Sequence, residues 1–164
     1  MKFIRFFIVL LILSGCGFKP LYYGDYKNDI LSDFYCERIT NDQKNPRATF
    51  FLNNKLDRLF KGNNQREPKF SIKIEYDVDK DDYLIQDYKV ANRKKIQVTL
   101  SYKVTEYKGH KILASGKLTD FDSFAITESS YSDYVTEEEL IIRILLSLIQ
   151  ELRLQILAKF SKET

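Results

Sequence analysis

The chain has 164 residues, of which 44% are hydrophobic and 30% are charged. Its 26 basic and 23 acidic residues give a net charge of +3, and two of the basic residues fall within the first 15 positions. The 149 residues after position 15 (164 minus 15) therefore have nearly balanced charge and suffice for one domain with one core. This balance excludes the basic surface typical of a nucleic-acid-binding protein, so no nucleic acid partner is expected.

Residues 1–15 have the pattern of an export signal. Lys2 and Arg5 give a positive start, and the apolar run Phe6–Leu13 follows and ends at two small residues. The run is eight residues long, whereas a helix needs about 20 apolar residues to span a bilayer. The pattern predicts a signal peptide that is cleaved, so residues 1–15 are left out of the fold.

The tetrapeptide Leu13-Ser14-Gly15-Cys16 resembles the bacterial lipobox, in which an aliphatic and two small residues precede a cysteine. A lipobox implies cleavage before Cys16, a thioether from its sulfur to diacylglycerol, and acylation of the new amino terminus. Because each buried methylene contributes about 0.8 kcal/mol, three acyl chains anchor a protein lastingly. The alternative is an ordinary signal peptide followed by an incidental cysteine. Apart from these lipids no cofactor is expected.

The chain after the signal divides into a lipidated leader over residues 16–30 and a single domain over residues 31–164. Phe34 to Ile39 predicts a short strand. Asn45 and Pro46 predict an N-cap and first helical position, and apolar residues recur at helical spacing from there to residue 61. Cys36, the only other cysteine, is expected to be a small buried residue, with an intermolecular disulfide as the alternative.

Two further segments alternate apolar and polar residues with period two. Phe70–Val78 and Ile96–Tyr107 are each predicted to form a half-buried strand, separated by a polar turn at Asp79–Asp82 and the segment Tyr83–Val90. Lys108 and Gly109 predict a tight turn after the second strand.

A third strand is expected from Lys111 to about Phe124. Gly116 inside it indicates a bulge or a close approach of the backbone. The three strands together predict an antiparallel meander.

The last element is a long helix, predicted to begin between Ser130 and Thr136 and to run through Leu140–Phe160. Thr136 and Glu139 have the spacing of a capping box. Its apolar face is wider than half the circumference, which leaves two interpretations open: burial between the sheet and the first helix, or a second face for a partner or lipid. The element order predicts an α+β two-layer sandwich, with two helices on one face of an antiparallel (mixed) four-stranded sheet.

Few residues have the spacing of a catalytic or metal site. Asp77, Asp79 and Asp81 begin like a calcium loop, but Asp82 stands where glycine is needed and Tyr88 where a bidentate glutamate is needed. His110 is the only histidine and makes neither a zinc site nor an evident triad. We therefore expect no metal site, no catalytic residue and no enzyme.

Two basic clusters remain as candidate ligand-binding residues. Arg93, Lys94 and Lys95 precede the central strand, and Lys108, His110 and Lys111 lie at the hairpin. Lysine and arginine suit the phosphate oxygens of an anionic head group, whereas the alternative role is solubilising charge at strand ends.

The segment Cys16-Gly17-Phe18-Lys19-Pro20-Leu21-Tyr22 resembles the mature start of LptE, the lipopolysaccharide-assembly lipoprotein, in its alphaproteobacterial form. Leu52–Leu59 resembles the first helix of that family, with its L-x-x-x-L-x-x-L pattern. Asn92–Tyr102 resembles its TR-x-x-L-x-V-x-x-Y strand, although Asn92 replaces the usual threonine, and Asp122–Arg143 resembles the segment that leads into its last helix. The resemblance covers nearly the whole mature chain.

This resemblance implies an outer-membrane lipoprotein on the periplasmic side that plugs the lumen of the LptD β-barrel. It also implies help in barrel assembly and in moving lipopolysaccharide to the cell surface, without catalysis. Gly17 after the lipidated cysteine is similar to lipoproteins that are released to the outer membrane. With lipid A phosphates as the ligand, Arg93, Lys94, Lys95 and Lys111 become the expected contacts.

Two other functions remain open. The first is an envelope lipoprotein that binds peptidoglycan or another ligand without a barrel partner. The second is a lipid-anchored hydrolase, which would need a pair of carboxylates such as those within Asp77–Asp82 to line a cleft.

Overall fold

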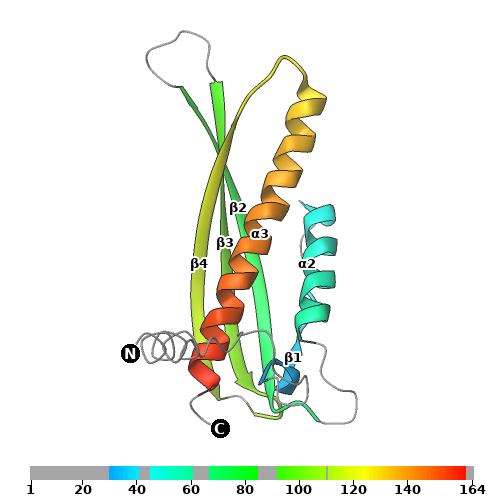
Figure 1. Cartoon of the computed structure of the whole chain (residues 1–164), viewed down its shortest axis with the longest axis vertical. Helices are drawn as coiled ribbons and strands as arrows, with labels where there is room; N and C mark the ends of the chain where they lie inside the picture. The colour runs from blue at the N-terminus through cyan, green and yellow to red at the C-terminus, as the bar shows by residue number, and fades with distance from the viewer. Residues whose placement is uncertain (1–29, 41–44, 61–66, 85–91, 110, 162–164) are drawn as a thin grey trace, which may run out of the picture.

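The computed structural model describes residues 30–40, 45–60, 67–84, 92–109 and 111–161 (Figure 1). The elements in chain order are the 3-10 helix η2 (Ile30–Asp33), β1 (Phe34–Cys36), α2 (Pro46–Leu59), β2 (Phe70–Leu84), β3 (Asn92–Glu106), β4 (Ile112–Ala125) and α3 (Ser130–Phe160). The strands form one sheet in the order β1-β2-β3-β4. β1 pairs parallel with β2, and the other pairs are antiparallel. The expected α+β fold with a mixed four-stranded sheet and two helices is confirmed.

The period-two pattern of the sequence sets the two faces of the sheet. Over Phe70–Asp82, Arg93–Glu106 and Ala114–Ala125, even-numbered residues point toward the helices and odd-numbered residues point away, because successive side chains of a strand alternate between faces. Ile112 and Leu113 lie beyond the register shift at Val104/Thr105 and do not follow this numbering. The fully or nearly buried residues of these strands are all even-numbered apart from Ser71: Ile72, Ile74, Ile96, Val98, Leu100, Val104, Ala114 and Leu118. The core therefore lies between the sheet and α3, and the other face, here called the open face, has none of the described helices over it (Figure 1).

The three main strands are unusually long. β2 and β3 have 15 residues each and β4 has 14, against about five or six in an average strand. At about 3.4 Å per residue the sheet is about 50 Å long, and α3 runs along most of it (Figure 1). The domain is thus an elongated two-layer sandwich.

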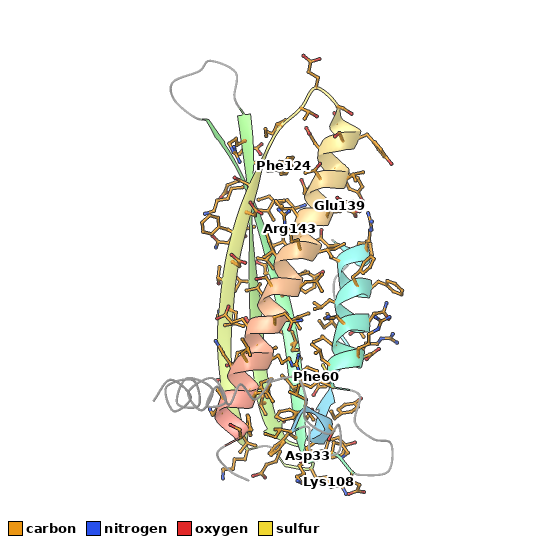
Figure 2. The ribbon with its side chains drawn as sticks, viewed as in Figure 1. Asp33, Phe60, Lys108, Phe124, Glu139 and Arg143 are labelled. Carbon is orange, nitrogen blue, oxygen red and sulfur yellow. The ribbon has the colours of Figure 1, made fainter. Side chains whose placement is uncertain are left out.

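An aromatic cluster closes the core at the end of the sheet where β1 lies. Phe34 packs with its ring centroid 4.9 Å from that of Phe70 and 5.3 Å from that of Phe160, and Phe60 joins it at 6.0 Å. Because these residues come from β1, β2, α2 and α3, the cluster ties four elements together. Figure 2 labels Phe60 and Asp33 at this end of the molecule.

α2 ends two residues before the predicted boundary, and it begins as predicted with Asn45 at the N-cap and Pro46 in the first turn. The Asn45 side chain makes no cap hydrogen bond. Instead its carbonyl oxygen accepts hydrogen bonds from the backbone N–H and the hydroxyl of Thr49, and the hydroxyl of Thr49 also lies 2.8 Å from that of Tyr76 on β2. The start of α2 is therefore fixed by the sheet as well as by its own sequence.

Asn53 on α2 holds the chain that leaves β1. Its side chain is buried, accepts a hydrogen bond from the backbone N–H of Ile39 and donates one to the carbonyl of the same residue. One amide thus satisfies both backbone groups, as a neighbouring strand would. β1 itself is shorter than the predicted strand and ends at Cys36.

The predicted turn at Asp79–Asp82 is wrong, because these residues continue β2. They pair with Lys94–Gln97 of β3, with Asp81 opposite Lys95 and Asp82 opposite Lys94. Opposite charges across a strand pair are favourable, so the sequence rich in aspartate is stable here as a strand. Of the segment Tyr83–Val90, residues from 85 onward lie outside the described residues.

The hairpin between β3 and β4 contains the predicted turn, in which the N–H of Gly109 donates to the carbonyl of Glu106 at 3.1 Å. Gly116 marks a close approach and not the bulge, which lies at Val104/Thr105. Gly116 pairs with Tyr102, and a Cβ on Gly116 would come within 2.9 Å of the Tyr102 ring. The tyrosine ring therefore covers the glycine.

α3 begins at Ser130, which is earlier than the capping box predicted. The cap is Ser129, whose hydroxyl accepts a hydrogen bond from the N–H of Ser132. Thr136 is already inside the helix, and its hydroxyl donates to the carbonyl of Ser132. The capping box at Thr136 is therefore wrong.

The wide apolar face of α3 is explained by burial on two sides. Leu148 and Leu152 are buried in the core with the sheet residues, whereas Leu145 and Ile149 are buried where α3 meets α2. The first of the two interpretations is thus confirmed for most of the face. Among the described helices, none has the length and apolar character to cross a membrane.

Candidate interaction surface

The predicted lipidation site lies outside the part of the chain that the structure describes. Residues 1–29 include the signal, Cys16 and almost all of the leader. The thioether at Cys16 therefore stays a prediction.

The four predicted basic residues do not form one site. Arg93, Lys94 and Lys95 lie at the start of β3, and Lys111 is exposed just before β4, at the other end of the sheet. About twelve residues of extended strand separate the two ends, which corresponds to about 40 Å. Figure 2 shows the same separation between Phe124, which pairs with Lys94, and Lys108 of the hairpin. No single head group can contact both clusters.

Arg93 and Lys95 share the open face with the exposed ring of Phe121. An Nη atom of Arg93 donates to the carbonyl and the hydroxyl of Ser123 at 3.2 and 3.0 Å. Nζ of Lys95 lies 4.5 Å from the ring centroid of Phe121, which is 61% exposed. Lys95 therefore lies over an exposed apolar ring on the open face, and Arg93 is held on the same face by Ser123.

Lys94 points the other way and binds α3. Its Nζ lies 3.2 Å from Oε2 of Glu137, and the other oxygen of that carboxylate binds Lys80 of β2. Burial alone would raise the pKa of Glu137, but the hydrogen bonds and charges of the two lysines outweigh it and hold the pKa below its usual value. Lys94 is thus engaged in an ion-pair cluster that joins β2, β3 and α3.

Two further contacts fix the first half of α3, and sequence reasoning did not identify them. Arg47 of α2 binds Glu138 at 3.1 Å. Arg143 binds Asp122 of β4 at 2.5 Å, and Figure 2 shows Arg143 directed from α3 toward β4. The pKa of Asp122 is lowered by the backbone N–H of Ser123 and by Arg143.

The charges on the open face are largely divided by strand. β2 presents exposed acids at Glu75, Asp77, Asp79 and Asp81, and its exposed cation Lys73 on this face pairs with Glu75 at 2.8 Å. The described side chains that β3 and β4 present on this face include no acid, and their cations are Arg93, Lys95, Lys103 and Lys117. Between the charges lie polar residues such as Thr99 and Thr119, whose hydroxyls are 3.2 Å apart. The face is therefore polar along its length, with an acidic and a basic stripe.

The aspartates of β2 lie along an extended strand, so they do not wrap around a point as calcium ligands must. Within the described ranges, no group of three or more His, Cys, Asp or Glu could hold a metal ion. His110 lies outside these ranges. Cys36 is a partly buried free cysteine, and its burial, with smaller effects of Asp57 and Glu37, raises its pKa to about 12.

A shallow apolar groove lies between α2 and α3. It is lined by Ala48, Phe51, Leu52, Ile142, Leu145, Leu146 and Ile149. Phe51 and Leu146 are 44% and 37% exposed, and Phe50 beside them is 62% exposed. This exposed apolar surface is the part of the α3 face that burial does not explain. It is the part to which the second interpretation, a face for a partner or lipid, still applies.

The fold of this chain is similar to those of proteins of known structure. No protein-family model matches the chain, and no curated protein matches it significantly. A candidate lipoprotein of Caulobacter crescentus has a similar crystal structure, with a TM-score of 0.63 and 11% identity over 82% of this chain and 95% of that one. A minor lipoprotein of Acinetobacter baumannii is similar with a TM-score of 0.54 and 16% identity over 76% and 88%. At these identities the likeness establishes that the chain shares their fold.

Proposed function

We propose that the protein is a lipid-anchored lipoprotein of the outer membrane whose domain plugs an LptD-type β-barrel. In this role it assists assembly of the barrel and transport of lipopolysaccharide to the outer leaflet. It acts by binding and not by catalysis.

The observation that carries the proposal is the polar open face of the long sheet. An antiparallel sheet commonly leaves one polar face to water, and here that face is continuous over three strands of 14 or 15 residues. The interior wall of a large outer-membrane barrel is polar as well. Polar residues of this face such as Gln97, Thr99 and Thr119 can form hydrogen bonds with such a wall, and its acidic and basic side chains can pair with charged groups there.

Two further observations support the envelope location. The lipobox at Cys16 and the segment through Tyr22 resemble the start of the LptE lipoproteins. The chain also shares its fold with two proteins described as lipoproteins.

Lipopolysaccharide contact belongs to the same proposal. Arg93 and Lys95 are the stronger candidates, because both lie on the open face and Lys95 lies over Phe121, an apolar ring that can contact an acyl chain. Lys94 would have to leave Glu137 to bind a phosphate. Lys111 lies at the far end of the sheet, so it would have to bind a different head group from the one that Arg93 and Lys95 contact.

Affinity purification from detergent-solubilised outer membranes tests the proposal. The tagged lipidated protein is washed with high salt, and bound proteins are identified by mass spectrometry. We expect a large β-barrel in a stoichiometric amount. A Cys16→Ala variant serves as the control, because without the anchor it should recover much less of the barrel. If the wild-type protein comes through alone, the barrel partnership is wrong and the ligand-binding lipoprotein becomes the better account.

A further inference from the structure

β4 is the outer strand of the sheet, so one of its two edges faces away from β3. The hydrogen bonds at the hairpin show which of its backbone groups lie on that edge. Glu106 donates its N–H toward Lys111 of the β4 side, whereas Tyr107 donates toward Lys69 of the β2 side. Even-numbered residues of β3 therefore bond to β4. From Val104 toward Arg93, past the register shift at Val104/Thr105, their partners in β4 are even-numbered too. The odd-numbered residues of β4 have their N–H and C=O groups on the outer edge.

Toward the C-terminal end of β4, aspartate side chains cap the outer N–H groups of this edge. The carboxylate of Asp120 accepts the outer N–H of Phe121 at 2.9 Å, and that of Asp122 accepts the outer N–H of Ser123 at 2.7 Å. A negatively charged cap on each edge donor is one way in which proteins prevent a further strand from pairing.

Residues 115–119 of the same edge have no such caps. The N–H groups of Ser115, Lys117 and Thr119 have no acceptor among the described residues. An aspartate could not be placed beside them, because the even-numbered neighbours Ala114 and Leu118 are 7% exposed in the core and Gly116 lies under the Tyr102 ring. Five residues of edge, 115–119, are therefore open to pairing.

An apolar residue of α3 flanks this open part on the helix side. Arg143 of α3 reaches Asp122 at the β4 edge. Leu154 is 11 residues further along, which is about three helical turns, so it lies on the same side of α3. It is 55% exposed. A side chain pointing toward α3 from a strand added at the β4 edge would meet Leu154.

The open face next to the edge is basic. Lys117 lies on β4, and Lys103 lies on β3 opposite Ser115. Both are exposed, and the described residues of β3 and β4 offer them no acid on this face. An added strand would therefore be favoured if its residues on this side were acidic, since opposite charges on neighbouring strands attract.

We propose that the β4 edge between Ser115 and Thr119 accepts an extended segment of a protein partner, in which apolar residues facing Leu154 alternate with acidic residues facing Lys117. Main-chain hydrogen bonds would give such a contact its affinity, and the alternating side chains would give it specificity. The proposal depends on the edge of β4 and not on the identity of a barrel partner.

Hydrogen exchange of the full lipidated protein in detergent micelles tests this edge. The probe is a nine-residue peptide in which valine and glutamate alternate. At saturating peptide, the fast-exchanging amides of residues 115–119 should slow by about tenfold or more, because edge amides exchange freely until they are paired. A peptide with lysine in place of glutamate should bind about fivefold more weakly, and a peptide with valines and glutamates grouped together should give no protection.

Four variants separate strand pairing from other binding. Lys117→Pro removes an outer N–H without removing a hydrogen bond to β3, and it should abolish the protection, whereas Lys117→Ala should only weaken it. Leu154→Glu provides a second test that leaves the strand untouched, and it should weaken binding. Phe50→Glu, an equally exposed apolar residue on α2, is its control and should have no effect.

Two results would overturn the proposal. The first is unchanged exchange of residues 115–119 at saturating peptide in the folded wild-type protein. The second is protection of these residues without peptide that rises with protein concentration, because the edge would then be occupied by a second copy of the chain.

Discussion

Nζ of Lys94 on β3 lies 3.2 Å from Oε2 of Glu137 on α3. The carboxylate also binds Lys80 of β2, so one acid joins three elements. No residue of α3 before Leu140 is fully buried. Ion pairs therefore attach the first ten residues of this helix to the rest of the domain, whereas buried apolar contacts attach the residues that follow.

Glu137→Gln should lower the free energy of unfolding by about 1–2 kcal/mol, because the pairs are partly buried and the amide keeps no charge. The pKa of Glu137 is held low in the folded protein, so its stabilisation is present above its usual pKa of 4.5 and is lost as pH falls through the lowered folded value. Urea unfolding at pH 7 and in acid should show the difference between wild type and variant shrinking in acid. Glu139→Gln, an exposed neighbour, should change stability by less than about 0.5 kcal/mol. An equal effect of the two substitutions would contradict the role of Glu137.

Gly116→Ala should destabilise the domain by about 1–3 kcal/mol, because the new methyl group would overlap the ring of Tyr102. Thermal or urea unfolding measures the change. Gly109→Ala is the matched control, since its Cβ would meet the exposed and flexible side chain of Glu106. If a Tyr102→Ala background left the cost of Gly116→Ala unchanged, the ring would not be its cause.

Cys36 should react slowly with iodoacetamide in the folded protein. Its pKa of about 12 leaves very little thiolate at pH 8, so alkylation should be at least about a hundredfold slower than that of an ordinary thiol. Mass spectrometry of the peptide that contains Cys36 gives the rate, and adding urea should restore normal reactivity. Fast labelling of the folded protein would rule out the buried thiol.

Cys16→Ala should leave an unlipidated precursor. Cells grown with radioactive palmitate should label the wild-type protein and a Cys36→Ala control, but not the Cys16→Ala variant. Label that persists in that variant would refute the lipobox assignment.

The order of the main elements could be predicted because the hydrophobic period is regular in each of them. Ile72, Ile74, Val98 and Leu100 alternate with polar residues, and the apolar residues of α3 recur at helical spacing. The same alternation already puts Lys94 on the face of Ile96 and Lys95 on the other. The basic run could therefore have been divided between the two faces from the sequence alone.

The features that were missed depend on contacts between distant segments. Asp79–Asp82 looks like a turn until the register puts it opposite Lys94–Gln97. Ser129 and Thr136 are both acceptable caps, and the choice between them follows from contacts at Thr127, whose N–H and hydroxyl bind Asp133. The ion pairs of Glu137 join residues 43 and 57 positions apart, a separation at which no local pattern identifies a partner.

The most direct test of the account is site-specific photocross-linking from Thr99, at the middle of the open face. A benzophenone amino acid at this position in the lipidated protein, irradiated in cells, should give one major adduct with a large outer-membrane β-barrel. The adduct should be lost when Cys16→Ala removes the anchor. A properly localised protein that forms no adduct with a barrel from this position would contradict the claim that the open face meets the barrel wall.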